Sequence, residues 1–311
     1  MRISAAVAAA IAGGRPVVAL ESTLITHGLP RPENLAAGRA LEDVVRANGA
    51  VPATIGVLRG EVVVGLTDAE LEYLASVDAD KASTWNLAAI IASGRDAGTT
   101  VATTLLAADL SGIAVFATGG IGGVHNTDFD ESADLAALAR HPVLTVCAGP
   151  KSILNVRATL ERLETAGVPV VGYASGNLAG FLMRETDLKV PARADSPEAA
   201  ARILAAQKAF GLSAAVVLSN PVSAGLTTEQ FGDFLREAEA GLLRDGISGA
   251  DSTPYLLGAL AKVSGGLTVE VNTRLLRENA ALAAQVAVAY SRLEQTVAPS
   301  QDAVVHAGGS R

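Results

Sequence analysis

The chain has 311 residues, half of them hydrophobic, and a formal net charge of −8. This length and apolar content are enough to bury the core of one large domain. The acidic balance excludes a broad surface that holds nucleic-acid phosphates, but it leaves room for one small basic pocket for a phosphorylated metabolite.

Cysteine usage and hydropathy narrow the class of protein further. Cys147 is the only cysteine, so no disulfide can form within the chain, and a cytoplasmic location is expected. We expect Cys147 to be a small buried apolar group in a strand and not a nucleophile. No apolar run approaches the roughly 18 residues of a membrane span. The alanine-rich first residues favour a short helix over a signal peptide.

The first third of the chain alternates between strand and helix patterns. A short apolar run, VVAL at residues 17–20, predicts a buried strand that delivers Glu21 to a loop. The patterns that follow are a helix at 34–48, a hairpin of 53–58 with 61–66 around Arg59-Gly60, and a helix started by the capping box of Thr67 and Glu70.

The central stretch holds the most polar loops. An apolar run at residues 113–117 stops at Thr118 and gives way to a glycine-rich segment, GGIGG. The next features are His125, an acidic cluster, a helix at 133–140, and an apolar run at 143–148 that ends in Gly149-Pro150-Lys151. Strand, glycine loop, acidic loop, helix, strand and lysine, in this order, predict a polar pocket at the carboxyl edge of a sheet.

The remaining chain continues the alternation. Its patterns are a helix at 152–166, a strand at 169–173, a helix after Ser196-Pro197, a strand at 214–219, a helix at 228–244 closed by Gly246, a helix after Thr253-Pro254, and a long C-terminal helix that contains Asn272. We expect a three-layer α/β/α sandwich around a mixed, largely parallel sheet. Residues 1–297 are expected to form a single domain, and residues 298–311 a disordered tail.

Two lysines and one glutamate are candidates for chemistry. A lysine amine kept among apolar groups loses its charge more readily and can attack a carbonyl to form a Schiff base, which suits Lys151 after its strand and Gly-Pro turn. Lys81 could pair with a phosphate. Glu21, at the end of an apolar strand, would have a raised pKa if partly desolvated and could move protons. Each could instead be a solvated or capping residue at the end of an element.

The acidic cluster after the glycine-rich segment suggests a divalent cation. His125, Asp128, Asp130 and Asp134 offer the oxygen-rich surroundings that Mg²⁺ or Mn²⁺ takes. The alternative is that Asp130 and Ser132 cap the helix that follows.

Several other features have both a functional and a structural interpretation. The GGIGG segment could let backbone amides approach a phosphate, although it matches neither GxGxxG nor a Walker loop. His27 and Asn272 are more often structural than catalytic at such positions. Trp85, the sole tryptophan, is expected in the core or at a subunit contact, and His141 before Pro142 in a loop.

Seven motifs occur in a fixed order: ALESTLITHGLPRPEN, GTTVATT, VFATGGIGGVH, FDESADL, CAGPKSILN, SNP and DSTPYLL. In this order they resemble the pseudouridine-5′-phosphate glycosidase family over about residues 11–293. The resemblance implies an α/β/α fold, a homotrimer and bound Mn²⁺. It also implies an enzyme of pseudouridine catabolism that reversibly cleaves the C–C glycosidic bond of pseudouridine 5′-phosphate to uracil and ribose 5-phosphate.

The same resemblance implies roles for individual residues. Glu21 matches the proton donor and Lys151 the nucleophile that forms an imine with ribose C1′. The other matches are Lys81 and Val101 at the substrate site, Asp130 as the metal ligand, Ser132, Ala133 and Asp134 as a substrate-binding triplet, and Thr118, His125 and Asn272 as further pocket residues.

This sequence departs from the family after Lys81, where a basic run of the S-R-R-D type is common. Here Ser83 is followed by Thr84-Trp85-Asn86, which puts phosphate binding or a subunit contact in doubt. Two alternatives stay open: a Schiff-base lyase acting on another sugar phosphate, and a non-catalytic sugar-phosphate binding protein. All three readings predict a small-molecule ligand and neither a nucleic-acid nor a membrane partner.

Overall fold

The computed structural model describes residues 1–126, 130–247 and 252–297. The expected tail of 298–311 and Asp128 of the acidic cluster lie outside these ranges. Across the described ranges, no helix combines the length and apolar character needed to cross a bilayer.

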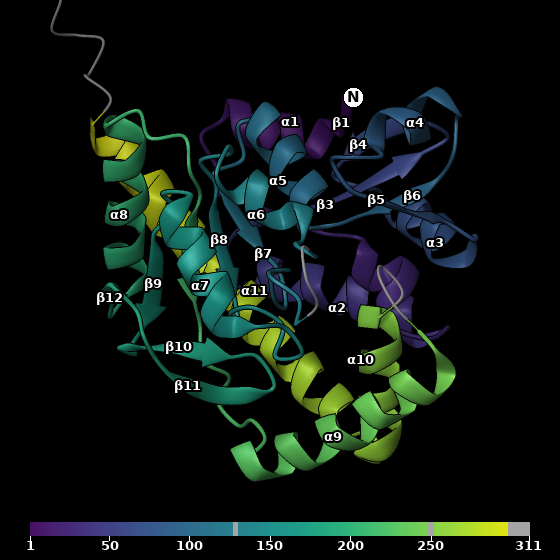
Figure 1. The fold of residues 1–311 in the computed structure, drawn as a ribbon. Helices are drawn as coiled ribbons and strands as arrows, with labels where there is room; N and C mark the ends of the chain where they lie inside the picture. The colour runs from purple at the N-terminus through teal and green to yellow at the C-terminus, as the bar shows by residue number, and fades with distance from the viewer. Residues whose placement is uncertain (127–129, 248–251, 298–311) are drawn as a thin grey trace, which may run out of the picture.

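One large mixed sheet forms the middle layer (Figure 1). Its main path runs in the order β1 (Arg2–Ile3), β4 (Glu61–Val64), β3 (Val51–Leu58), β2 (Val17–Leu20), β7 (Val115–Ala117), β8 (Leu144–Cys147), β13 (Val216–Ser219), β9 (Val170–Tyr173) and β12 (Ala192–Ala194). All neighbours from β3 to β12 are parallel, whereas β4 is antiparallel to β3. The predicted mixed, largely parallel sheet is therefore confirmed.

A side branch brings two more strands to the sheet. The first half of β3 pairs with β2, and its second half pairs antiparallel with β6 (Ala97–Thr99). Next to β6 lies β5 (Asp80–Ala82), parallel to it. Because β6 runs opposite to β3, its carboxyl end points back toward the carboxyl end of β2. Separate from this sheet, β10 (Asn177–Gly180) and β11 (Met183–Lys189) form a hairpin.

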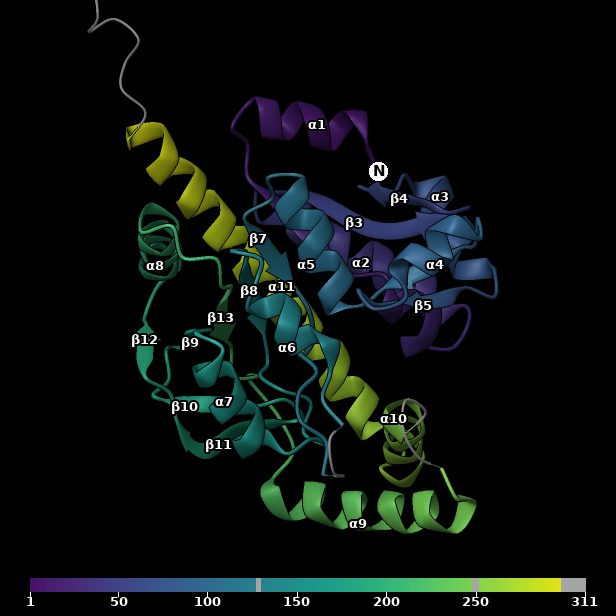
Figure 2. The same cartoon turned by 45° about the horizontal axis from the view of Figure 1, so that its top comes forward.

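Helices cover both faces of the sheet, as Figure 2 shows. Alternate strand residues face opposite sides, so Val18 and Leu20 pack in one core and Val17 and Ala19 in the other. The first core contains α2 (Glu33–Ala47), α8 (Pro197–Ala209), α9 (Thr228–Asp245), α10 (Ser252–Val263) and α11 (Leu267–Val297). The second contains α1 (Ala5–Ala12), α5 (Val101–Leu110), α6 (Ala133–Leu138) and α7 (Val156–Thr165). The expected α/β/α sandwich is confirmed.

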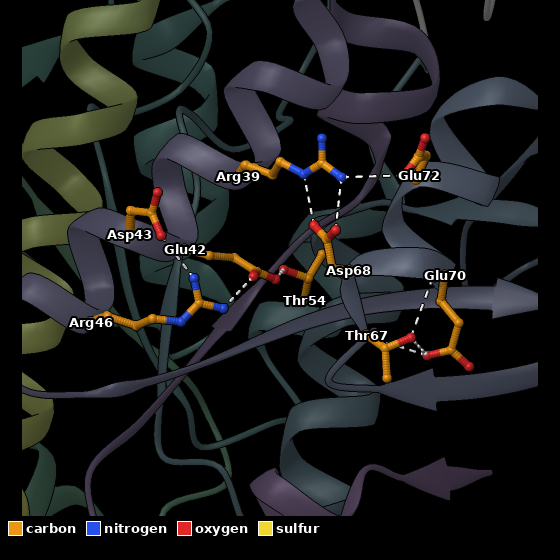
Figure 3. Close-up of polar contacts among 9 residues, drawn as sticks. All are labelled: Arg39, Glu42, Asp43, Arg46, Thr54, Thr67, Asp68, Glu70 and Glu72. Atoms are coloured by element: carbon orange, nitrogen blue, oxygen red, sulfur yellow. Dashed lines mark hydrogen bonds and ion pairs between the residues drawn. The ribbon is translucent and has the colours of Figure 1, made fainter.

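A third, smaller cluster packs the π-helical turn η1 (Leu24–Gly28) against α3 (Asp68–Ser76). Figure 3 shows the polar contacts that join α2 to this region. Buried Glu42 accepts a hydrogen bond of 2.6 Å from Thr54 of β3, and Arg46 lies 2.7 Å from the same carboxylate. Arg39 holds Asp68 through two bonds of 2.7 and 2.8 Å. Exposed pairs contribute at most about 1 kcal/mol each, so burial of Glu42 makes its bonds the more important anchor.

Local signals in the sequence place most element boundaries correctly. The capping box of Thr67 with Glu70 and the left-handed Gly246 after α9 are both present. The helix predicted at 152–166 begins only at Val156, because Asn155 caps it and buried Ile153 and Leu154 occupy a turn before it. The helix predicted at 133–140 ends at Leu138. Between β5 and α4 (Leu87–Ala92), Trp85 is 80% exposed, so its placement in the core of the chain is wrong.

Candidate active site

The centre of the site lies where β2 and β7 end. In the parallel register Leu20 is opposite Ala117, so Glu21 and Thr118 leave the sheet side by side. The hydroxyl of Thr118 donates a hydrogen bond to the Glu21 carboxylate. Thr118 itself is buried, whereas Glu21 is half-buried. Glu21 is therefore held at the carboxyl edge, as its position in the sequence predicts.

Lys151 reaches the same edge along an extension of β7 and β8. Ala148 donates to the carbonyl of Gly119 at 2.9 Å, and the Lys151 N–H donates to the carbonyl of Ile121 at 3.1 Å. The two segments thus continue side by side past the sheet. A Cβ at Gly149, which has φ +86°, would lie 2.4 Å from the carbonyl oxygen of Ala179. Only glycine allows this approach.

Two amides of the GGIGG segment bond within the protein, and its glycines allow close packing. The N–H of Ile121 donates to Gly149 at 3.1 Å, and that of Gly122 donates to the Asp134 carboxylate at 2.8 Å. A Cβ at Gly120 would lie 2.7 Å from the ring of Phe181. The glycines therefore permit close contacts, and the two amides are used within the protein.

The predicted triplet of Ser132, Ala133 and Asp134 lies at the start of α6. Ser132 caps the helix by accepting a bond from the Asp134 N–H at 3.2 Å. Asp134 is only 6% exposed, and its second carboxylate oxygen accepts a bond of 3.0 Å from the N–H of Ala102. Asp134 therefore ties the glycine-rich segment to the N-terminus of α5, and both of its oxygens have partners.

Lys81 and the start of α5 form another side of the site. Lys81 lies on β5 opposite Gly98 of β6, and Ala82 accepts a bond of 3.0 Å from the N–H of Thr100. Val101 is the first residue of α5 and is buried. The hydroxyl of Thr100 is buried and has no hydrogen-bond partner in the described ranges. The N-terminus of α5 thus offers a free donor beside Lys81.

The charges of four side chains from separate segments act on one another: Glu21, Lys81, Asp134 and Lys151. Burial raises the pKa of Glu21, and Asp134 raises it further, whereas the Lys151 ammonium, the Thr118 hydroxyl and Lys81 lower it. The pKa of Lys81 is lowered by desolvation first and by the nearby Lys151 second, against the charges of Asp134 and Glu21. The site thus combines two amines with two carboxylates, and Glu21 is shifted toward its neutral form.

His27 and Cys147 border the centre without joining it. Thr26 contacts the His27 ring at 2.6 Å, and burial followed by the charge of Lys81 lowers the pKa of His27. Cys147 is fully buried in β8, and burial raises the pKa of its thiol to about 12. Cys147 is therefore a packing residue, as predicted.

The candidate metal ligands lie on the rim. His125 and Asp130 are joined by a backbone bond of 2.9 Å, and the His125 ring is 3.8 Å from the Asp130 carboxylate. Asp130 is 39% exposed, and Arg162 holds the neighbouring Glu131 at 2.8 Å. Among the described residues no group of three histidine, cysteine, aspartate or glutamate side chains could hold a metal. The donors fit a cation that keeps most of its water and takes one carboxylate.

A family model described as indigoidine synthase A like protein matches residues 6–289. The chain belongs to the indigoidine synthase A-like family. Its curated relatives below are enzymes, and the chain is an enzyme of this family.

Two relatives carry the name pseudouridine-5′-phosphate glycosidase. The protein from Thermus thermophilus is 56% identical over 90% of this chain and 99% of its own length. The protein from Salinispora tropica is 50% identical over 93% of this chain and 91% of its own. The family resemblance read from the motifs is thus confirmed.

Two solved structures share the fold. Prealnumycin C-glycosynthase AlnA, in complex with ribulose 5-phosphate, is 39% identical with a TM-score of 0.87 and covers 94% of this chain and 98% of its own. An indigoidine synthase A-like protein from Thermotoga maritima is 35% identical with a TM-score of 0.83, covering 90% and 94%.

In this member of the indigoidine synthase A-like family, α11 carries two asparagines: Asn272, which was predicted in the pocket, and Asn279, which was not. Asn272 is half-buried on α11, and its side chain makes no hydrogen bond to the described residues. About two helical turns further on, Asn279 is 1% exposed and donates to the carbonyl of Thr118 at 2.8 Å. An asparagine among the apolar residues of a helix was the available signal, because a buried amide needs a partner.

Proposed function

We propose that this chain reversibly cleaves the C–C glycosidic bond of pseudouridine 5′-phosphate, giving uracil and ribose 5-phosphate through an imine on Lys151. The carrying observation is that Glu21, at the carboxyl end of β2, lies within reach of the charges of Lys81 and Lys151 from two distant segments. The names of the curated relatives and the ribulose 5-phosphate bound to AlnA support a sugar phosphate as ligand. The catalytic unit is residues 1–297.

The chemistry requires both an amine and an acid. The Lys151 amine bonds to C1′ while the C1′–O4′ bond breaks, and O4′ takes a proton. The C1′–C5 bond then breaks with its electron pair going to C5, which takes a proton, and an imine remains between C1′ and Lys151. Water hydrolyses the imine to ribose 5-phosphate and frees the amine. Glu21, with its raised pKa, is suited to give these protons near neutral pH.

The start of α5 is suited to the substrate phosphate. A helix N-terminus attracts anions, and the start of α5 adds the Thr100 hydroxyl, which has no hydrogen-bond partner among the described residues. Lys81 supplies a positive charge from β5. Binding at this remote end would hold the opened sugar in line between Glu21 and Lys151.

Asp130, with His125 beside it, is the residue we assign to Mn²⁺. One carboxylate together with water and substrate oxygens is a common way to hold such a cation. When bound, Mn²⁺ would supply positive charge near the phosphorylated substrate. The proton and imine steps above use only Glu21 and Lys151.

Changing Asp130 to asparagine should weaken Mn²⁺ binding by about tenfold or more, because the amide carries no charge. Titration of free Mn²⁺ by electron paramagnetic resonance measures this without turnover. Glu131→Gln is the matched control, since Arg162 already pairs with Glu131. Equal affinity in the wild type and Asp130→Asn would remove Asp130 from the metal site.

A homotrimer is the assembly we propose, with the surface around α4 as part of the subunit contact. Trp85 is 80% exposed and Ile91 41%, and the exposed alanines of α4 lie beside them. Large apolar side chains gathered on one surface are typical of a protein interface.

Sedimentation should give the wild type three times the 31.4 kDa mass of one chain. Trp85→Ser should shift the mass toward the monomer, because tryptophan often dominates an interface. Phe210→Ser is the control, since Phe210 is 85% exposed at the C-terminal cap of α8. A wild-type monomer would contradict the assembly, and an intact Trp85→Ser trimer would contradict this surface.

The function is tested by incubating the protein with Mn²⁺, uracil and ribose 5-phosphate and following the product by mass spectrometry. We expect a product with the mass of pseudouridine 5′-phosphate that resists acid cleavage of N-glycosides. A borohydride-trapped adduct without dependence on uracil would instead indicate a lyase for another sugar phosphate. Binding of ribose 5-phosphate without an adduct would indicate a binding protein.

A further inference from the structure

Two buried asparagines form a pair behind the proposed acid. Asn279 projects from α11, and Asn220 directly follows β13; they are 1% and 9% exposed. Asn220 Nδ2 donates to Asn279 Oδ1 at 3.0 Å. Asn279 Nδ2 donates to the carbonyls of Thr118 at 2.8 Å and Gly119 at 3.3 Å. Because those two carbonyls can only accept, they define which end of the Asn279 amide faces them.

The pair joins the ends of three parallel strands. Asn279 holds the first two residues after β7, and the backbone N–H of Asn220 donates to the carbonyl of Cys147 in β8 at 2.8 Å. Asn220 itself continues β13. The end of β7, which backbone bonds join to β8, is thus held also by a residue that lies 161 positions later in the chain.

Asn279 therefore acts on Glu21 through one intermediate residue. The carbonyl that it binds belongs to Thr118, whose hydroxyl donates to the Glu21 carboxylate. If Thr118 moves, this hydroxyl loses its alignment with the Glu21 carboxylate, which the charges of Lys151, Lys81 and Asp134 also face from other elements. Asn279 does not contact Glu21 in any hydrogen bond of the described ranges.

We propose that Asn279, oriented by Asn220, is a positioning residue that holds the Thr118 hydroxyl against Glu21 and so sets the pH range of the reaction. The proposal rests on the proposed function of Glu21 as proton donor. Alignment of this kind has large effects on rate, since a misplacement of about 1 Å can cost roughly 100-fold.

Asn279→Ala should lower kcat/KM by about 10- to 100-fold. It should also move the basic limb of the pH profile, where kcat/KM falls as pH rises, to higher pH. The direction follows from Thr118: its hydroxyl favours the carboxylate, so without it Glu21 stays protonated to higher pH. Val286→Ala is the matched control, because Val286 is fully buried in the same helix and core. It should lower thermal stability yet leave the pH profile unchanged.

A double-mutant cycle separates positioning from loss of stability. Thr118→Val should shift the basic limb in the same direction, and adding Asn279→Ala to it should produce no further shift. Asn220→Ala leaves the Asn279 amide free to turn and is the second variant to use where Asn279→Ala does not fold. Shifts that add in the double variant, or an unchanged pH profile in the folded single variants, would overturn the proposal.

A readout without substrate distinguishes this proposal from the proposed function. The Glu21 carboxyl can be titrated by ¹³C NMR in the wild type and in Asn279→Ala. A higher pKa in the variant supports the positioning role even if no pseudouridine 5′-phosphate is cleaved. An unchanged titration contradicts it, even if the wild type is an active glycosidase.

Discussion

Lys151→Ala is expected to reduce turnover by about four orders of magnitude or more while leaving the fold intact, because the proposed imine-forming nucleophile is removed. Lys151 is half-buried, and its side chain makes no hydrogen bond or ion pair to the described residues, so its loss should cost little stability. Product mass after incubation with uracil and ribose 5-phosphate measures the rate. Circular dichroism checks the fold.

Borohydride trapping identifies the amine directly. Ribose 5-phosphate should add one sugar phosphate to the wild type and none to Lys151→Ala. Lys189→Ala is the control, since Lys189 lies on β11 and pairs with Asn177 at 2.8 Å. An adduct that persists in Lys151→Ala but disappears in Lys81→Ala would move the nucleophile to the other lysine of the site.

Glu21→Gln should lower kcat by about 100- to 10,000-fold with a smaller change in KM, because glutamine keeps the shape of the side chain but gives no proton. Its carbonyl oxygen can still accept the Thr118 hydroxyl bond. In the wild type, kcat/KM should fall as pH rises through the raised pKa of Glu21. In the variant this basic limb should be lost, and a pure loss of affinity would contradict the acid–base role.

The same substitution has a consequence for stability. Because the folded-state pKa of Glu21 is raised, its contribution to stability is fully present below the unfolded-state pKa and is lost as pH rises through the folded-state pKa. Glutamine does not titrate. Urea unfolding at mildly acidic and at alkaline pH should therefore show that the free energy of unfolding of Glu21→Gln increases relative to that of the wild type as pH rises.

Much of the site could be predicted from local sequence because its residues follow apolar strands. In a parallel sheet such strands end at one edge, which predicted Glu21 at a strand end and a polar pocket around the segment that contains Thr118 and Lys151; the structure brings Glu21 and Thr118 into contact. The turn Arg59-Gly60, with φ of +50° and +77°, is likewise a local feature. These predictions depend on patterns only a few residues long.

The missed features depend on contacts between distant segments. Asn279 is relevant to the site because it contacts Thr118, 161 residues away. The hydroxyl of Thr100 is relevant because the start of α5 lies beside β5. The glycines of GGIGG suggest a ligand loop by composition, but Phe181 and Asp134 are what approach them. No local periodicity contains this information, since tertiary packing decides it.

The position of α11 bears on how the protein is made. Ribosomes deliver the chain from its N-terminus, so Glu21, Lys81 and Lys151 emerge long before Asn279. Until α11 has been synthesised, the strand ends lack the hydrogen bonds from Asn279, and the part of the core that packs against Ala283 and Val286 is uncovered. On the proposed mechanism, a nascent or prematurely terminated chain would therefore carry the Lys151 amine without an aligned Glu21, and competence for reaction would come only as synthesis finishes.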